Sequence, residues 1–203
     1  MKKIISIAIF FIFSSIIQQN VMYGFDSLEL QLNENGKFIE NGVKLIYETE
    51  NKDEFQRLVK KLTDVKGHEK IGIKDNLINY DENNTKYSIT VWQEEKTKVS
   101  IQVINTDREK LTKDILNEIV QLSDDSSLSQ KVYKYTKIET EKNYKDGIDF
   151  LDKDINIDRE IEINNGKVIN GTLRDDTEVN LAHMKYDTGN YVIVGTPMIF
   201  VTY

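Results

Sequence analysis

The chain has 203 residues, 27 Lys and Arg against 34 Asp and Glu, a formal net charge of −7, and no cysteine. This length suits one domain or two small fused halves. The acidic balance disfavours binding to nucleic acid or to anionic lipid headgroups. Without cysteine, neither disulfide bonds nor a cysteine-linked lipid can hold the protein, so its stability must come from an apolar core.

The N-terminus is typical of a bacterial export signal. Lys2 and Lys3 precede an almost wholly apolar run at residues 4–17. That run is shorter than the about 20 apolar residues that a membrane span needs. The best small residue for cleavage is Gly24, and two outcomes stay open: cleavage near it, or retention of the segment as an N-terminal anchor. We expect an extracytoplasmic protein in either case, secreted or attached to the cell envelope.

We expect a signal over residues 1–24 and a single domain over 25–203, made of two halves at about 25–125 and 126–203. Removal of the signal would take away two lysines and leave 25 basic against 34 acidic residues, a net charge of −9.

The export interpretation predicts that replacing Ile9 and Phe11 by Asp traps the protein inside the cell, because two charges abolish the apolar run. Fractionation of producing cells, probed with an antibody, measures this. Normal secretion of the double variant would contradict the signal.

The first element expected is a helix at residues 26–35. Asp26 and Glu29 have capping-box spacing, and Phe25 with Leu30 could form a hydrophobic staple. The alternative is a strand, because leucines also alternate there. A strand at 43–47 follows.

A second helix is expected at 51–65. Asn51 and Glu54 have capping-box spacing, and an apolar stripe recurs at helical intervals. The stripe consists of Phe55, Leu58, Val59, Leu62 and Val65. A short strand at 71–73 comes next.

Strict alternation of apolar and polar residues predicts a hairpin of strands at 87–91 and 99–103. A third helix is expected to begin at Thr106, which has capping-box spacing with Glu109, and to carry the stripe Leu111, Ile115, Ile119 and Leu122.

The second half is expected to be mostly strand. A strand at 132–138 leads into an acidic loop over 139–158, and Asn165-Gly166 is a strong hairpin turn signal. Strands at 179–186 and 191–194 follow, then a last strand at 198–203. These patterns predict an α+β fold with helices on one face of a curved antiparallel sheet.

The C-terminal residues carry a family resemblance. Asn-Leu-Ala-His-Met-Lys-Tyr at 180–186 precedes an aromatic-apolar run at 191–203, which contains Gly195-Thr196-Pro197 and ends in Tyr203. With the hairpin and helix order upstream, this resembles the YwmB-like family, exported proteins of Gram-positive spore formers. The resemblance implies a two-repeat fold like that of TATA-box-binding protein, a place in the envelope and no catalytic residues. Gly195, Thr196 and Pro197 would be a structural bend between strands.

Candidate chemistry is sparse. His68 and His183 lack the clustered ligands of a zinc site. The Asp-x-Asp-x-Asn-x-Asp run at 152–158 starts like a calcium loop but lacks its glycine and its final glutamate. We therefore expect no cofactor and no metal. No nucleophile motif occurs, and acid pairs for glycoside hydrolysis are too easily found among 34 acids to indicate an active site.

Trp92, Tyr133 and Tyr135 lie on predicted strands, and Tyr133 and Tyr135 share one face. They could meet a partner or pack within the sheet. Because the lysines have acids close by in sequence, no basic surface is expected. We expect a non-enzymatic module that binds an envelope protein or wall polymer, binds no nucleic acid, and has no membrane contact beyond its N-terminal segment. The alternative is an envelope hydrolase that uses carboxylates.

Overall fold

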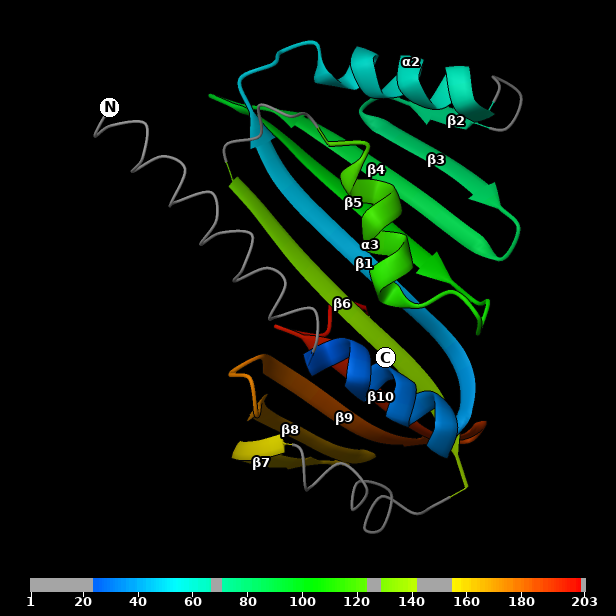
Figure 1. The fold of residues 1–203 in the computed structure, drawn as a ribbon, viewed down its shortest axis with the longest axis vertical. Coiled ribbons are helices and arrows are strands. Elements are labelled where there is room, and N and C mark those ends of the chain that lie inside the picture. The colour runs from blue at the N-terminus through cyan, green and yellow to red at the C-terminus, as the bar shows by residue number, and fades with distance from the viewer. Residues whose placement is uncertain (1–23, 67–70, 124–128, 142–154, 202–203) are drawn as a thin grey trace, which may run out of the picture.

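The computed structural model describes residues 24–66, 71–123, 129–141 and 155–201 (Figure 1). These residues form three helices: residues 24–35, α2 (Glu54–Lys66) and α3 (Thr112–Val120). The strands are β1 (Lys37–Thr49), β2 (Ile71–Lys74), β3 (Leu77–Glu82), β4 (Thr85–Gln93), β5 (Thr97–Asn105), β6 (Ser129–Thr140), β7 (Ile155–Ile163), β8 (Gly166–Leu173), β9 (Glu178–Tyr186) and β10 (Gly189–Thr196). The predicted export signal lies outside the described residues.

All ten of these strands belong to one sheet, in the order β2-β3-β4-β5-β1-β6-β10-β9-β8-β7, and each pair of neighbouring strands is antiparallel. β1 and β6 pair in the middle, so the first-half strands lie to one side and the second-half strands to the other. Strand direction turns across the sheet (Figure 1), as the twist of antiparallel strands requires. The expected α+β class is confirmed.

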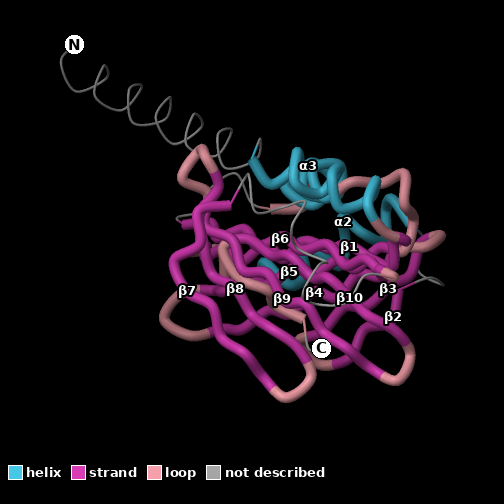
Figure 2. Tube along the Cα trace, turned by 90° about the horizontal axis from the view of Figure 1, so that it is seen from below, coloured by secondary structure: helices cyan, strands magenta, loops and turns pink. Residues whose placement is uncertain are grey.

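The helices pack on one face of this sheet, which we call the helix face (Figure 2). Over the first half, α2 and α3 bury Leu58, Leu62, Ile115 and Ile119 against alternate apolar residues of β1, β3, β4 and β5. Over the second half, helix 24–35 buries Phe25, Leu28 and Leu32 against β6 and β8 to β10. The period-2 alternation of the strands therefore supplies one apolar layer across the whole sheet.

On the opposite face, the C-terminal segment covers part of the second half. Half-buried Ile199, Phe200 and Val201 pack against four buried residues: Tyr135, Ala182, Met184 and Ile193. The described residues after Thr196 are not a strand, so the strand expected at 198–203 is wrong over 198–201.

Gly195 permits this return of the chain. A Cβ atom on Gly195 would lie 2.9 Å from the backbone nitrogen of Ile199, and the Thr196–Pro197 peptide is cis. The expected bend at Gly195-Thr196-Pro197 is therefore present, but it leads into a covering segment instead of a strand.

Helix 24–35 is present, but neither the expected capping box nor the expected hydrophobic staple forms at its start. Asp26 forms an ion pair with Lys134, and Glu29 is buried in the core. Phe25 is buried, whereas Leu30 is 47% exposed, so the two residues do not form a staple. Residues expected to contact each other within the helix therefore contact residues that are distant in sequence.

The helix over 51–65 is confirmed as α2, except that Val65 is 71% exposed and adds nothing to the apolar stripe. α3 begins at Thr112 and not at Thr106, with the N–H of Leu111 donating to Asp114 Oδ2 at 3.2 Å. Residues 106–110 instead form a connecting segment, where Asp107 Oδ1 accepts from the N–H of Glu109.

The expected hairpins are confirmed: β4 with β5, β7 with β8 around Asn165-Gly166, and β9 with β10. β3 was not predicted. Most of the acidic loop at 139–158 lies outside the described residues, as does most of the calcium-like run; Asn156 and Asp158 lie in β7.

Candidate functional site

A buried polar cluster joins helix 24–35 to the middle of the sheet and to the start of α3. Glu29, which is 0% exposed, accepts hydrogen bonds from Asn41 Nδ2 at 2.7 Å, Thr112 Oγ1 at 2.6 Å and the Thr112 N–H at 3.0 Å. Asn105 Nδ2 donates to Asn41 Oδ1 at 2.9 Å. Burial raises the pKa of Glu29, and its hydrogen-bond donors oppose that rise.

Lys134 anchors the same helix from β6. Its Nζ lies 2.8 Å from Asp26 Oδ1 and 5.8 Å from the centre of the Phe25 ring, and the side chain is 3% exposed. We interpret this cluster as a structural junction, because its carboxylates are engaged by groups of the core.

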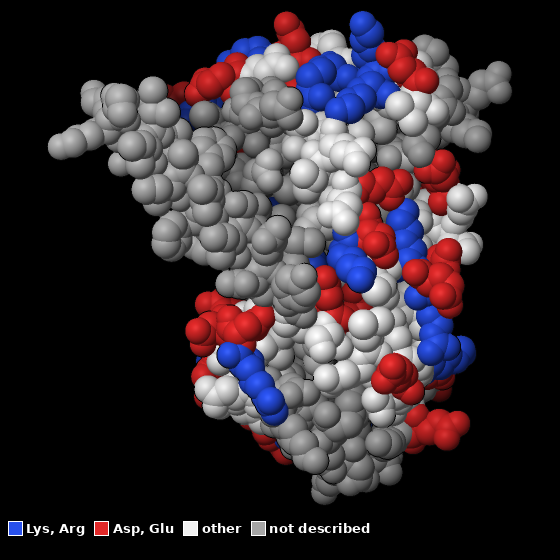
Figure 3. Space-filling model, in the orientation of Figure 1, with Lys and Arg blue, Asp and Glu red and all other residues white. Residues whose placement is uncertain are grey.

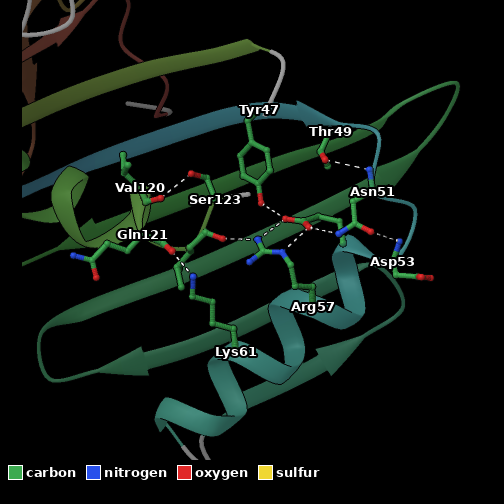
Figure 4. Close-up of polar contacts among 11 residues, drawn as sticks. Tyr47, Thr49, Asn51, Asp53, Arg57, Lys61, Val120, Gln121 and Ser123 are labelled. Atoms are coloured by element: carbon green, nitrogen blue, oxygen red, sulfur yellow. Dashed lines mark hydrogen bonds and ion pairs between the residues drawn. The ribbon is translucent and has the colours of Figure 1, made fainter. Parts of the chain in front are cut away.

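A second buried carboxylate, that of Glu54, ties the start of α2 to the end of α3 (Figure 4). Tyr47 Oη donates to Glu54 Oε1 at 2.5 Å, and Asn51 Nδ2 donates to Oε2 at 3.0 Å. Arg57 Nε and Nη2 donate to the two oxygens at 2.7 and 2.6 Å, and Nη2 also reaches the Leu122 carbonyl at 2.6 Å.

The environment of Glu54 fixes the charge of its partners. Burial, followed by the hydrogen bond to Glu54, raises the pKa of Tyr47, so its hydroxyl stays protonated. The hydrogen bonds to Glu54 raise the pKa of Arg57. The spacing of Asn51 and Glu54 predicted a capping box, in which side chains bond to backbone N–H groups. The two residues are in contact, but the hydrogen bond joins their side chains.

We expect Glu54→Ala to lower the free energy of unfolding by about 3 kcal/mol, because it removes the acceptor of the Tyr47 hydroxyl and the charged partner of Arg57. Arg57 keeps the Leu122 carbonyl. Urea denaturation measures this. Glu50→Ala is the control: Glu50 lies 3.7 Å from exposed Lys96, and such pairs contribute less than about 1 kcal/mol. Equal losses in both variants would contradict the anchoring role.

The sheet face opposite the helices is free of any described helix over the first half, and we call this surface the open face. It consists of the alternate residues of β1 to β6 that lie opposite the helix face, as the strand registers define them. They are Gly42, Lys44, Ile46, Glu48, Gly72, Lys74, Leu77, Asn79, Asp81, Lys86, Ser88, Thr90, Trp92, Lys98, Ser100, Gln102, Ile104, Ser129, Lys131 and Tyr133. Beyond this surface, Glu40 and Lys137 pair on the same side beside Tyr135, and their charges are opposite.

These residues form cross-strand rows, the contact unit of a sheet. One row is Tyr133, Lys44, Gln102, Ser88 and Asn79. Its neighbour is Lys131, Ile46, Ser100, Thr90 and Leu77. Each of these rows holds one lysine. The direct cross-strand partners of Lys98 and Lys86 on this face include the acids Glu48 and Asp81.

The open face is basic. It carries five lysines (Lys44, Lys74, Lys86, Lys98 and Lys131) and two acids (Glu48 and Asp81), a net charge of +3 on a chain whose total is −7. Among the described residues, none of these five lysines takes part in an ion pair.

The expectation that no basic surface forms is therefore wrong for this face. In a strand, residues adjacent in sequence point to opposite faces of the sheet, so an acid next to a lysine in sequence does not share its face. Many other acids lie on helices and turns, away from the open face. The helix face carries both signs of charge (Figure 3), with Lys and Arg gathered over α2 and Asp and Glu close by.

Two surface pockets lie elsewhere in the second half. One, of about 410 Å³, is lined mainly by Gly24, Ser27, Leu28, Gln31 and Leu173. The other, of about 570 Å³, is acidic and is lined by Glu34, Asn35, Gly36, Lys37, Glu139, Thr140 and Glu141. In the acidic pocket Lys37 Nζ pairs with Glu139 Oε2 at 2.9 Å.

The structure brings Trp92, Tyr133 and Tyr135 to the same side of the sheet. Trp92 is 41% exposed and Tyr133 is half-buried. Tyr135 is fully buried, with Phe200 edge-on at 5.1 Å between ring centres, and its hydroxyl donates to Glu40 at 3.1 Å. Burial raises the pKa of Tyr135. Its position favours packing, so Tyr133 and Trp92 are the aromatic candidates for contact with a partner.

The remaining candidates add no site. His183 is buried in β9, and His68 lies outside the described residues. No group of three or more acidic or histidine side chains among the described residues could hold a metal ion. None of the described helices is long and apolar enough to span a membrane.

No protein-family model matches the chain, and no curated protein matches it.

Proposed function

We propose that this protein is a non-enzymatic binding module of the cell envelope and that the open face is its binding surface. The observation that carries this proposal is the surface itself: six strands wide, mostly polar, and lined by lysines that form no ion pair within the described part of the chain. An extended sheet face of this kind suits an extended partner. The two buried carboxylates, Glu29 and Glu54, serve the core and offer no reaction centre to solvent.

Location outside the cytoplasm is part of the proposal. It is supported by the charged and apolar pattern of residues 1–24 and by the resemblance to the exported YwmB-like family. The same resemblance leads us to propose a two-repeat fold like that of TATA-box-binding protein. Its support is the strand order: β1 lies beside β5 and β6 beside β10, with the outer strands following in the same sequence in each half.

A hydrolase is the competing function, and the acidic pocket is where it would act. Glu34, Glu139 and Glu141 line that pocket, and glycoside hydrolysis needs two carboxyl groups on either side of the bond. Glu139 Oε2 is engaged by Lys37 Nζ at 2.9 Å, so this carboxylate is held by its neighbour and does not face a bound sugar freely.

One experiment separates the two functions. Purified cell walls are incubated with the exported form of the protein, and bound protein and released soluble wall fragments are both measured. Saturable binding without release of fragments supports the binding module. Time-dependent release that disappears in Glu139→Gln would establish the hydrolase instead.

Bulky neutral side chains test whether the open face carries the binding. Ser88 and Gln102 are cross-strand neighbours at its centre, so Ser88→Tyr with Gln102→Tyr should weaken wall binding at least tenfold by obstruction. The matched control is Gln56→Tyr with Asn117→Tyr, two exposed positions on α2 and α3. Equal binding by both double variants would reject the open face.

Duplex DNA is expected not to bind at 150 mM salt, despite the resemblance to a DNA-binding fold. A duplex carries one charge per about 1.7 Å, so it extends far beyond five lysines and meets the acidic remainder of the chain. A gel-shift titration measures this. Retardation at micromolar protein that weakens steeply with salt would contradict the expectation.

A further inference from the structure

We propose that the open face binds a linear phosphodiester polymer of the cell envelope, with the phosphates lying against its lysines. This inference rests on the proposed binding function and adds the chemical class of the ligand. A single flexible chain with repeating phosphates is the occupant that the face fits best.

The placement of charge on the open face favours an anionic ligand. Lysines elsewhere in the described structure are often neutralised by acids, as Lys37, Lys134 and Lys167 are. The five open-face lysines form no ion pair there, and four of them are exposed while Lys44 is half-buried. Positive charge left unpaired on an acidic protein attracts an anionic ligand and raises its rate of association.

The spacing of the lysines suits a ligand with repeating charges. With strands about 4.8 Å apart and a rise of about 3.4 Å per residue, the Cα atoms of Lys44 and Lys131 lie roughly 8 Å apart. By the same geometry those of Lys98 and Lys131 lie about 12 Å apart. Flexible lysine side chains can bridge such intervals to successive charges of one chain. Ile46, Glu48 and Ser100 lie among these three lysines. The hydroxyl and amide groups of Ser88, Thr90 and Gln102 lie farther across the face, toward Lys86 and Lys74.

The amino-acid composition of the open face differs from that of a protein–protein interface. Protein–protein interfaces are depleted in Lys and Ser at their centres and enriched in Arg and aromatic residues. The open face has the reverse bias and contains no arginine. Lysine acts as a point charge without the fixed fork geometry of arginine, which suits a repetitive polymer that needs no single register. Small-molecule sites are mostly apolar, whereas most residues of this face are polar or charged.

Acids at the rim favour a single chain over a duplex. Exposed Asp75 lies in the turn before β3, and exposed Glu94 and Glu95 lie in the turn that joins β4 to β5. A thin polymer can follow the lysines between these acids. A duplex, with its rigid and denser array of phosphates, would bring some of them against the rim.

Trp92 makes binding measurable without a label. It is the one tryptophan of the chain, it lies on the open face, and its cross-strand neighbour is Lys98. The probe is poly(glycerol phosphate), titrated into the exported form of the protein while the fluorescence of Trp92 is followed at several salt concentrations. We expect saturable binding that weakens as salt rises.

The decisive variant carries Lys44→Gln, Lys98→Gln and Lys131→Gln. Its affinity should fall at least tenfold at about 100 mM salt, and the slope of log K against log salt should shrink by about 2, at about 0.7 for each lost phosphate contact. The control carries Lys60→Gln, Lys113→Gln and Lys185→Gln, which remove the same charge from positions off the open face. Its affinity should stay within twofold of the unmodified protein. Thermal melts establish that both variants fold.

Each other outcome overturns the inference in a distinguishable way. Equal losses in both triple variants would show attraction by total charge and reject the open face. Duplex DNA that binds as tightly as the polymer would reject the choice of ligand. A third outcome is that the protein does not bind poly(glycerol phosphate) but still binds cell walls from which the phosphate polymers have been removed. In that case this inference fails and the proposed function stands. If neither the polymer nor whole walls bind, both fail.

Discussion

Glu29→Ala is expected to lower the free energy of unfolding by about 3 kcal/mol. The Glu29 carboxylate accepts from Asn41 Nδ2 and from both the N–H and the hydroxyl of Thr112, where no side chain is exposed to water. Asn41 keeps the Lys110 carbonyl as an acceptor at 2.8 Å, but the two Thr112 donors lose theirs. Each buried donor without an acceptor costs about 1–3 kcal/mol.

Glu34→Ala is the matched control, because Glu34 lies on the same helix and is exposed. It should change stability by less than about 0.5 kcal/mol. Denaturant titration of both variants decides the matter. If Glu29→Ala costs no more than Glu34→Ala, helix 24–35 is not held by this junction.

The same carboxylate predicts a dependence of stability on pH. Burial raises the pKa of Glu29 above its ordinary value of 4.5, so the folded protein retains this proton to a higher pH than the unfolded chain does. The stabilisation linked to protonation is therefore complete below pH 4.5 and declines as the pH rises through the folded-state pKa. Glu29→Gln, which stays neutral, should lack this decline.

Local patterns in the sequence predict most of the sheet, because alternation with a period of two needs no knowledge of distant residues. Ile89, Val91, Ile101 and Val103 fall on the helix face as their spacing requires. β3 was missed, although Ile78 and Tyr80 alternate there, because the run is short and interrupted by polar residues.

The capping interpretation of Glu29 failed for a physical reason. A carboxylate three residues after Asp26 has the right spacing for a local cap, yet its strongest partner, Thr112, lies 83 residues away along the chain. Local spacing carries no information about such a pair. The same holds for α3, which begins at Thr112 and not at the predicted Thr106. The N–H and hydroxyl of Thr112, in the first turn of this helix, both donate to Glu29.

The basic open face, in contrast, could have been predicted. Lys86, Ser88, Thr90 and Trp92 alternate with buried residues in β4, as do Lys98, Ser100 and Gln102 in β5. Counting charge by face, and not by neighbourhood in sequence, separates the lysines from nearby acids. Which strands lie side by side, and hence that Lys44 and Lys131 join the same surface, depends on the order of the sheet.

Truncation after Gly195 is expected to lower the free energy of unfolding by about 3–5 kcal/mol. It removes Thr196 from β10 and strips Ile199, Phe200 and Val201 from the second half of the sheet. A fully buried side chain of this size contributes about 1.5–3 kcal/mol, so three half-buried ones contribute about half of that each, and Tyr135 becomes exposed as well. This is a large share of the about 5–15 kcal/mol that stabilises a typical domain.

Two point variants separate loss of packing from loss of chain length. Phe200→Ala should cost about 2 kcal/mol, because the ring packs edge-on against Tyr133 and Tyr135. Met198→Ala should cost little, because Met198 is 53% exposed. Thermal melts of the truncated chain and both variants measure the order of effects. A truncated protein that melts with the full-length chain would mean that the covering segment does not stabilise the sheet, and that the face beneath it can open while the domain stays folded.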